Sequence, residues 1–241
     1  MKKHLIAFPG DLSVNELIGK VLDILESVYH NESNHNKLLL MMRHEEPLDG
    51  LIHTILSQNT NDKNRDAAYA NLKNNWNNWE SVAKLKPEEL ADCIRTAGLS
   101  STKSERIIFI LNKIKHDYGE YSLLALKNKE ADYVREYLGS LPGIGPKTVS
   151  CVMLFDLGLP SFPVDTHISR VCKRLGAVPE SRKKNIAPEE ISVFMENIVP
   201  VERYLGAHVN IIEHGRNTCK AIKANCKMCS VKDYCLSYSS L

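Results

Sequence analysis

The chain has 241 residues, 43% of them hydrophobic and 25% charged, which is typical of a globular protein of one or two domains with a full core. No stretch approaches the roughly 18 apolar residues of a membrane helix, so we expect no membrane partner. The net charge of +2 permits a nucleic-acid partner without demanding one. Seven cysteines, three of them isolated in apolar stretches, favour the reducing cytoplasm over a disulfide framework.

Apolar residues recur at helical spacing along most of the chain. Leu51, Ile52, Ile55 and Leu56 form one such face, and similar faces lie at 107–114, 134–138 and 168–175. Alternating runs of strand length are absent, so the sequence predicts an all-α protein.

A turn between two helices is predicted at 141–148, LPGIGPKT. Gly143 and Gly145 permit a tight turn and close backbone approach. Pro146 suits the first turn of a helix, where its missing N–H costs nothing. Such a turn offers unpaired N–H groups to a phosphate, although a plain helix connection would use the same glycines.

Lys147 stands in the first turn of the second predicted helix. The helix dipole disfavours a cation there by up to about 1 kcal/mol, and neighbouring apolar residues would desolvate it further. Both effects favour a neutral, nucleophilic amine. A phosphate-binding lysine is the alternative that this motif leaves open.

Asp165 ends the segment FPVD before the amphipathic helix predicted at 168–175. An aspartate in this position is a good N-cap. A carboxylate held by helix amides also remains ionised and can face a developing positive charge, so a cap and a catalytic role are compatible.

Four cysteines close the chain with the spacing C-x6-C-x2-C-x5-C: Cys219, Cys226, Cys229 and Cys235. Four soft thiolates select zinc or an iron–sulfur cluster. Structural zinc sites usually show two C-x2-C pairs, whereas only one is present here, so a [4Fe–4S] cluster is favoured. Basic residues gather around the cysteines and would face phosphate: Arg216, Lys220, Lys223, Lys227 and Lys232.

LPGIGPKT, FPVDTH at 162–167, HGRNTC at 214–219 and the cysteine pattern, in this order, resemble the endonuclease III family of helix-hairpin-helix (HhH-GPD) DNA glycosylases. LSQNTND at 56–62 and AGLSSTK at 97–103 extend the resemblance, which runs from about Pro47 to Cys235. It departs from the family at Pro146, which replaces the arginine common before the lysine and removes one possible phosphate contact.

The resemblance implies an all-α, two-lobed fold. A six-helix barrel would span 39–159, with the helix-hairpin-helix at about 130–158, and a discontinuous [4Fe–4S] cluster domain would combine 1–38 with 160–241. Lys147 would be the nucleophile, Asp165 the catalytic carboxylate, and the four cysteines the cluster ligands. Leu99 would wedge into the base stack, and either Gln58 or Asn59 would fill the gap left by the flipped base. Further DNA contacts would come from Gly143, Gly145, His167, Lys220 and Lys223.

The activity implied is that of a bifunctional DNA glycosylase and AP lyase, acting as a monomer. It would remove oxidised pyrimidines from double-stranded DNA and nick 3′ to the abasic site. Two alternatives remain open: a uracil or thymine mismatch glycosylase of the same superfamily, and a non-catalytic DNA-binding module stabilised by its metal. Lys147 argues against strictly monofunctional relatives, and its pairing with Asp165 argues against a non-catalytic module.

Overall fold

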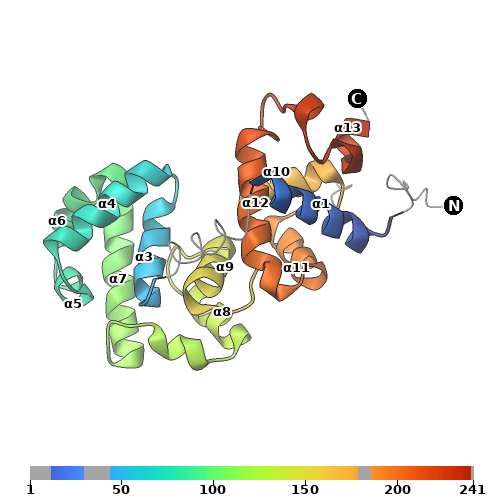
Figure 1. The fold of residues 1–241 in the computed structure, drawn as a ribbon. Helices are drawn as coiled ribbons and strands as arrows, with labels where there is room; N and C mark the ends of the chain where they lie inside the picture. Colours follow the sequence, from blue (N-terminus) through green and yellow to red (C-terminus); the bar gives the residue numbers. More distant parts are fainter. Residues whose placement is uncertain (1–11, 30–43, 179–185, 240–241) are drawn as a thin grey trace. The chain divides into compact units, whose positions relative to one another are not determined.

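The computed structural model describes residues 12–29, 44–178 and 186–239. Within these ranges the chain is helical with no strand, which confirms the predicted all-α class. The chain divides into two compact units (Figure 1). One spans Met42–Leu159, and the other combines Pro160–Leu241 with the N-terminal segment that carries α1. The domain boundary predicted between residues 38 and 39 lies outside the described residues.

The Met42–Leu159 unit is built from short helices around one apolar core. Its elements are α3 (Pro47–Ser57), α4 (Asp62–Asn75), α5 (Trp79–Ala83), α6 (Pro87–Cys93), the 3-10 turn Arg95–Ala97, α7 (Ser100–Tyr118), the 3-10 turn Leu124–Asn128, α8 (Ala131–Gly139), α9 (Pro146–Val152) and a π-helical turn (Met153–Leu157).

The long helix α7 organises this core, because α3, α5 and α6 all pack against it. Its inward residues Ile107, Ile110 and Ile114 are fully buried, as is the predicted apolar face of α3. Burial of this kind stabilises a fold by about 25 cal/mol per Å² of apolar surface, so the periodic isoleucines explain why the segment forms a helix here.

The second unit brings together the two ends of the described chain. Its helices are α1 (Val14–Tyr29), α10 (Thr166–Leu175), α11 (Pro188–Ile198), α12 (Tyr204–Asn217) and the short α13 (Leu236–Ser239), with 3-10 turns at Val201–Arg203, Cys226–Met228 and Lys232–Tyr234. The N-terminal α1 packs against α12 (Figure 1).

Polar contacts of Tyr29 and Arg203 fix the pairing of α1 with α12. The Tyr29 hydroxyl lies 3.2 Å from His214 Nδ1 and 3.0 Å from Thr218 Oγ1. Near the start of α12, Arg203 forms ion pairs with Asp23 and Glu26 of α1. No described helix combines the length and the apolar character required to cross a membrane.

Candidate active site and metal centre

The hairpin between α8 and α9 has the tight turn that its glycines predict. Gly143 has φ +73°, a left-handed conformation that a side chain would strain. A Cβ atom at Gly143 would also lie 2.6–2.7 Å from the Arg106 guanidinium, so α7 closes against the turn. Gly145 is the N-cap of α9, with φ −89°, and Pro146 occupies the first helical position as expected.

Lys147 is exposed at the start of α9, directly after the hairpin turn. The residues that follow it, Thr148 to Val152, are all buried and anchor the helix in the core. The desolvation expected for its amine is therefore absent in this structure.

The two candidate DNA contacts in the loop after α3, Gln58 and Asn59, lie in different environments. Gln58 Nε2 donates to the Gly143 carbonyl over 3.2 Å and approaches Thr148 Oγ1 at 3.4 Å, so this amide is already engaged with the hairpin. Asn59 is exposed and has φ +54°. The structure thus brings Gln58, the hairpin and the first turn of α9 into one cluster, with Asn59 projecting from its edge.

Leu99 is the N-cap of α7 and also adopts a left-handed conformation, with φ +49°. It is 59% exposed, an unfavourable state for a large apolar side chain unless it meets a partner. This is consistent with the wedge role that the resemblance implies.

Lys103, one turn further along α7, is buried, and the sequence motifs did not predict this. Its side chain is 1% exposed, and its Nζ donates to the carbonyls of Leu56 and Ala97, each at 2.8 Å. The signal was present in the sequence: Lys103 stands four and seven residues before Ile107 and Ile110, in the apolar stripe of the helix. Burial lowers the pKa of this lysine.

Asp165 caps α10, as its position in the sequence predicts. Its Oδ1 accepts the Ile168 N–H over 2.8 Å. The preceding extended segment is fixed by buried Phe162 and by His208 Nδ1, which lies 2.9 Å from the Pro163 carbonyl. The carboxylate is therefore rigid and only partly exposed. Asp165 belongs to the second unit, whereas Lys147 belongs to the Met42–Leu159 unit.

His167 is half-buried beside the cap rather than free on the surface. Its Nδ1 lies 3.1 Å from Arg170 Nη2, and the same guanidinium group donates to the carbonyls of Gly215 and Cys219. A Cβ at Gly215 would lie 2.9 Å from the His167 side chain, which accounts for the glycine in HGRNTC.

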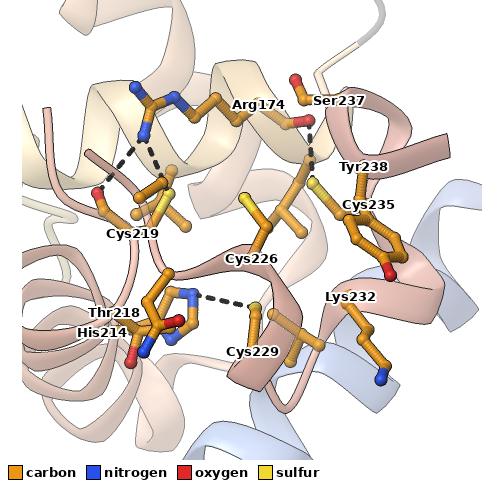
Figure 2. A pocket seen from close by; sticks show the side chains of 15 residues that line it. Arg174, His214, Thr218, Cys219, Cys226, Cys229, Lys232, Cys235, Ser237 and Tyr238 are labelled. Atoms are coloured by element: carbon orange, nitrogen blue, oxygen red, sulfur yellow. Dashed lines mark hydrogen bonds between the residues drawn. The ribbon is translucent and has the colours of Figure 1, made fainter. Parts of the chain in front are cut away.

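The four C-terminal cysteines line one pocket of about 40 Å³, more than the roughly 10–15 Å³ that a single water requires (Figure 2). Apolar side chains complete its wall: Val171, Leu175 and Val231. Among the described residues, no three histidine, cysteine or acidic side chains form a tight group that could hold a metal ion. The donor set nevertheless fits a cluster chemically, since four thiols line one pocket and no carboxylate competes there.

Hydrogen bonds to the sulfurs complete this site. Arg174 Nη1 lies 3.4 Å from Cys219 Sγ, and His214 Nε2 lies 3.7 Å from Cys229 Sγ (Figure 2). The same Arg174 nitrogen donates to the Lys220 carbonyl. Burial lowers the pKa of His214 to about 4 and raises the pKa of the Cys229 and Cys235 thiols. A donor such as Arg174 stabilises thiolate charge and tunes iron–sulfur clusters.

The loop between Cys219 and Cys229 is highly exposed. Lys220, Lys223 and Lys227 all project into solvent, together with the apolar side chains of Ile222 and Met228. A bound group on the four thiols would tie together the segment from Cys219 to Cys235 that carries this basic loop.

These features define a class: an all-helical protein whose hairpin presents a lysine and whose C-terminal loop is organised by four thiols. The family model of the HhH-GPD superfamily base excision DNA repair protein matches residues 52–196. Endonuclease III of Thermotoga maritima is 33% identical over 193 residues, covering 80% of this chain and 84% of that protein. A protein of Arabidopsis thaliana named as a DNA glycosylase is 34% identical over 183 residues, or 76% of this chain, which spans only 59% of that longer relative.

A solved structure of a trapped covalent intermediate of endonuclease III with DNA shares the fold. Its TM-score is 0.75 with 26% identity, and the match covers 95% of this chain and 99% of that one. The protein therefore belongs to the HhH-GPD superfamily of base excision DNA repair proteins, within which it is an endonuclease III-like DNA glycosylase.

Proposed function

We propose that the protein is a bifunctional DNA N-glycosylase and AP lyase that removes oxidised pyrimidines from double-stranded DNA. It would act as a monomer on DNA in the cytoplasm. The observation that carries the proposal is Lys147, an exposed amine in the first turn of the helix that follows the Gly143–Gly145 turn. A strictly hydrolytic glycosylase has no use for a nucleophilic amine at this place.

The reaction begins with extrusion of the damaged nucleotide, because its C1′ atom is inaccessible inside a stacked duplex. The lone pair of the Lys147 amine attacks C1′ and the glycosidic bond breaks, so the base leaves with the bonding electrons and takes up the proton that the amine loses. The Asp165 carboxylate, held in place as the N-cap of α10, would stabilise the positive charge that develops on the sugar. The sugar ring then opens to give a Schiff base between Lys147 and C1′.

The lyase step follows from that Schiff base. Its iminium group acidifies the C2′ protons, so one is removed and the C3′–O bond breaks, with the 3′ phosphate leaving with the electron pair. Hydrolysis of the remaining imine returns the Lys147 amine. The protein's residues thus perform base release and strand cleavage in one sequence of bond changes.

We further propose that Cys219, Cys226, Cys229 and Cys235 hold a [4Fe–4S] cluster. When bound, the cluster would join four points of the C-terminal segment 219–235 to one another, and no step of the reaction passes through it. Its consequence for function is electrostatic: the exposed lysines at 220, 223 and 227 would be held where they can meet DNA phosphates.

Borohydride trapping tests the proposed reaction. Purified protein is incubated with a duplex that carries thymine glycol, with Lys147→Gln as the comparison. We expect a covalent protein–DNA adduct with Lys147 intact and none with the variant. Base release without an adduct, especially from a U·G duplex, would support a monofunctional mismatch enzyme instead. No release and no adduct on lesion, abasic and U·G duplexes would overturn the proposal.

A further inference from the structure

The Lys103 side chain is 1% exposed, and the reaction described above does not use it. A buried amine is tolerated only when its N–H groups are hydrogen-bonded. Both of its acceptors are backbone carbonyls, Leu56 O and Ala97 O, at 2.8 Å each. They come from different parts of the chain, so one side chain joins the last turn of α3 to the 3-10 turn that precedes α7.

Each acceptor lies just before a residue with an unusual backbone. Leu56 precedes Asn59 by three positions, and Ala97 precedes Leu99 by two. Within the described residues, Asn59 and Leu99 are the two non-glycine residues with positive φ, at +54° and +49°. Non-glycine residues with this backbone conformation persist only where the surrounding structure holds them, and they concentrate at functional sites.

The Leu56 carbonyl accepts its hydrogen bond from Lys103 in place of the usual backbone N–H four residues later. Thr60 N–H, which would continue the α-helical pattern to Leu56, donates to the Ser57 carbonyl at 3.4 Å instead. Helix ends leave carbonyls without an intrahelical partner, and a lysine nearby satisfies them while countering the helix dipole. The ammonium group thus holds the end of α3 at the start of α7.

We propose that Lys103 is a positioning residue for nucleotide extrusion, holding the turns of Asn59 and Leu99 together so that both side chains enter the base stack as one rigid pair. The inference rests on the proposed function, since it concerns how the damaged nucleotide leaves the duplex. Gln58 has no part in this pair, because its amide is engaged by the hairpin.

The variant Lys103→Met removes the two hydrogen bonds while keeping a long side chain in the core. Lys115→Met is the matched control: Lys115 lies on the same helix, is exposed, and donates to one carbonyl, that of Gly119, away from both turns. We measure single-turnover release of thymine glycol from a duplex. We also measure borohydride trapping on a single-stranded abasic oligonucleotide, which has no stack to enter.

We expect Lys103→Met to slow base release from the duplex by about tenfold to a hundredfold, the usual consequence of a displacement of about 1 Å at a site. Trapping on the single strand should remain within about twofold of wild type, as should both reactions of Lys115→Met. Equal slowing on duplex and single strand, or no slowing at all, would overturn the inference. Wild-type protein that forms no adduct would instead overturn the proposed function.

Two further measurements separate positioning from loss of fold. Combining Lys103→Met with Leu99→Ala should slow duplex release less than the product of the separate effects, because both changes damage the same pair.

Amide exchange should quicken at 57–61 and 98–101 in Lys103→Met and stay unchanged in Lys115→Met. If the methionine variant does not fold, Lys103→Gln is used in its place, since its amide retains one donor group to a carbonyl. Independent effects, or unchanged exchange, would contradict the role assigned to Lys103.

Discussion

Gln58 Nε2 donates to the carbonyl of Gly143 over 3.2 Å, joining the loop after α3 to a hairpin turn 85 residues away in sequence. The contact links two segments that both belong to the motifs of this family. It also separates the roles of two neighbouring amides, because Gln58 is bonded inside the protein while Asn59 is exposed. Asn59 is therefore the better candidate for the gap left by an extruded base.

Alanine at either position tests this division. Asn59→Ala should slow release of a damaged base from a duplex by about tenfold while leaving the Kd for DNA nearly unchanged. Gln58→Ala removes a hydrogen bond worth about 1 kcal/mol from the hairpin, so it should raise the Kd by about fivefold. Single-turnover kinetics and equilibrium binding measure the two effects. The reverse pattern would assign the gap to Gln58.

The hairpin glycines should respond unequally to substitution. Gly143→Ala forces a side chain into a left-handed turn against Arg106, so it should destabilise the protein by about 1–2 kcal/mol and weaken binding to DNA. Gly145→Ala is the control for stability alone, since its φ is ordinary and no atom of the protein lies within 4 Å of the added Cβ. Thermal unfolding and salt titrations of binding check both variants. Equal effects would show that the turn geometry is not what matters.

Two substitutions separate the structural and chemical roles of Asp165. Asparagine can still cap α10 through its side-chain oxygen, so Asp165→Asn should leave stability almost unchanged, whereas Asp165→Ala should cost about 1 kcal/mol. Both remove the negative charge, so both should slow base release by about a hundredfold or more. If Asp165→Asn stayed active and only Asp165→Ala lost activity, the role of this residue would be to cap the helix and not to supply charge. The measurements are chemical denaturation and single-turnover kinetics.

Substitution of a thiol tests the candidate cluster. Cys226→Ser should lower bound iron and inorganic sulfide by at least about half and reduce the thermal stability of the protein, because a metal group that links four thiols contributes to folding. Cys93→Ser, outside the pocket, should change neither. Metal analysis that finds zinc, or no metal in freshly isolated protein, would contradict the assignment of a [4Fe–4S] cluster.

The stability of the protein should depend on pH through His53. Burial, with a contribution from Arg65, lowers the pKa of His53, and the hydrogen bond to Asp66 opposes this only in part; His44 and Tyr69 also contact the ring. The unfolded chain then binds a proton more readily than the folded one, so stability falls as pH drops through the interval below the ordinary histidine pKa of about 6.5.

His53→Gln should reduce that fall, because glutamine does not titrate. Thermal unfolding of both proteins between about pH 7 and pH 5 makes the comparison. An unchanged or steeper dependence in the variant would show that other groups control the acid sensitivity.

The sequence alone determined the helical class, the turn at Gly143 and Gly145, and the cap at Asp165. These features are local: helical periodicity, a positive φ and an N-cap each depend on a few neighbouring residues, so spacing and residue type are sufficient. The four thiols were also recognisable as a set because they lie within seventeen residues.

Tertiary structure decided which of two adjacent amides is free and why a lysine is buried in α7. The Gln58 amide donates to the Gly143 carbonyl, whereas Asn59 is exposed. Lys103 finds its acceptors in the last turn of α3 and in the 3-10 turn before α7, which precede it by 47 and 6 residues. Hydrogen bonds between distant segments require the packed core to bring donor and acceptor together. No short pattern in the sequence carries that information.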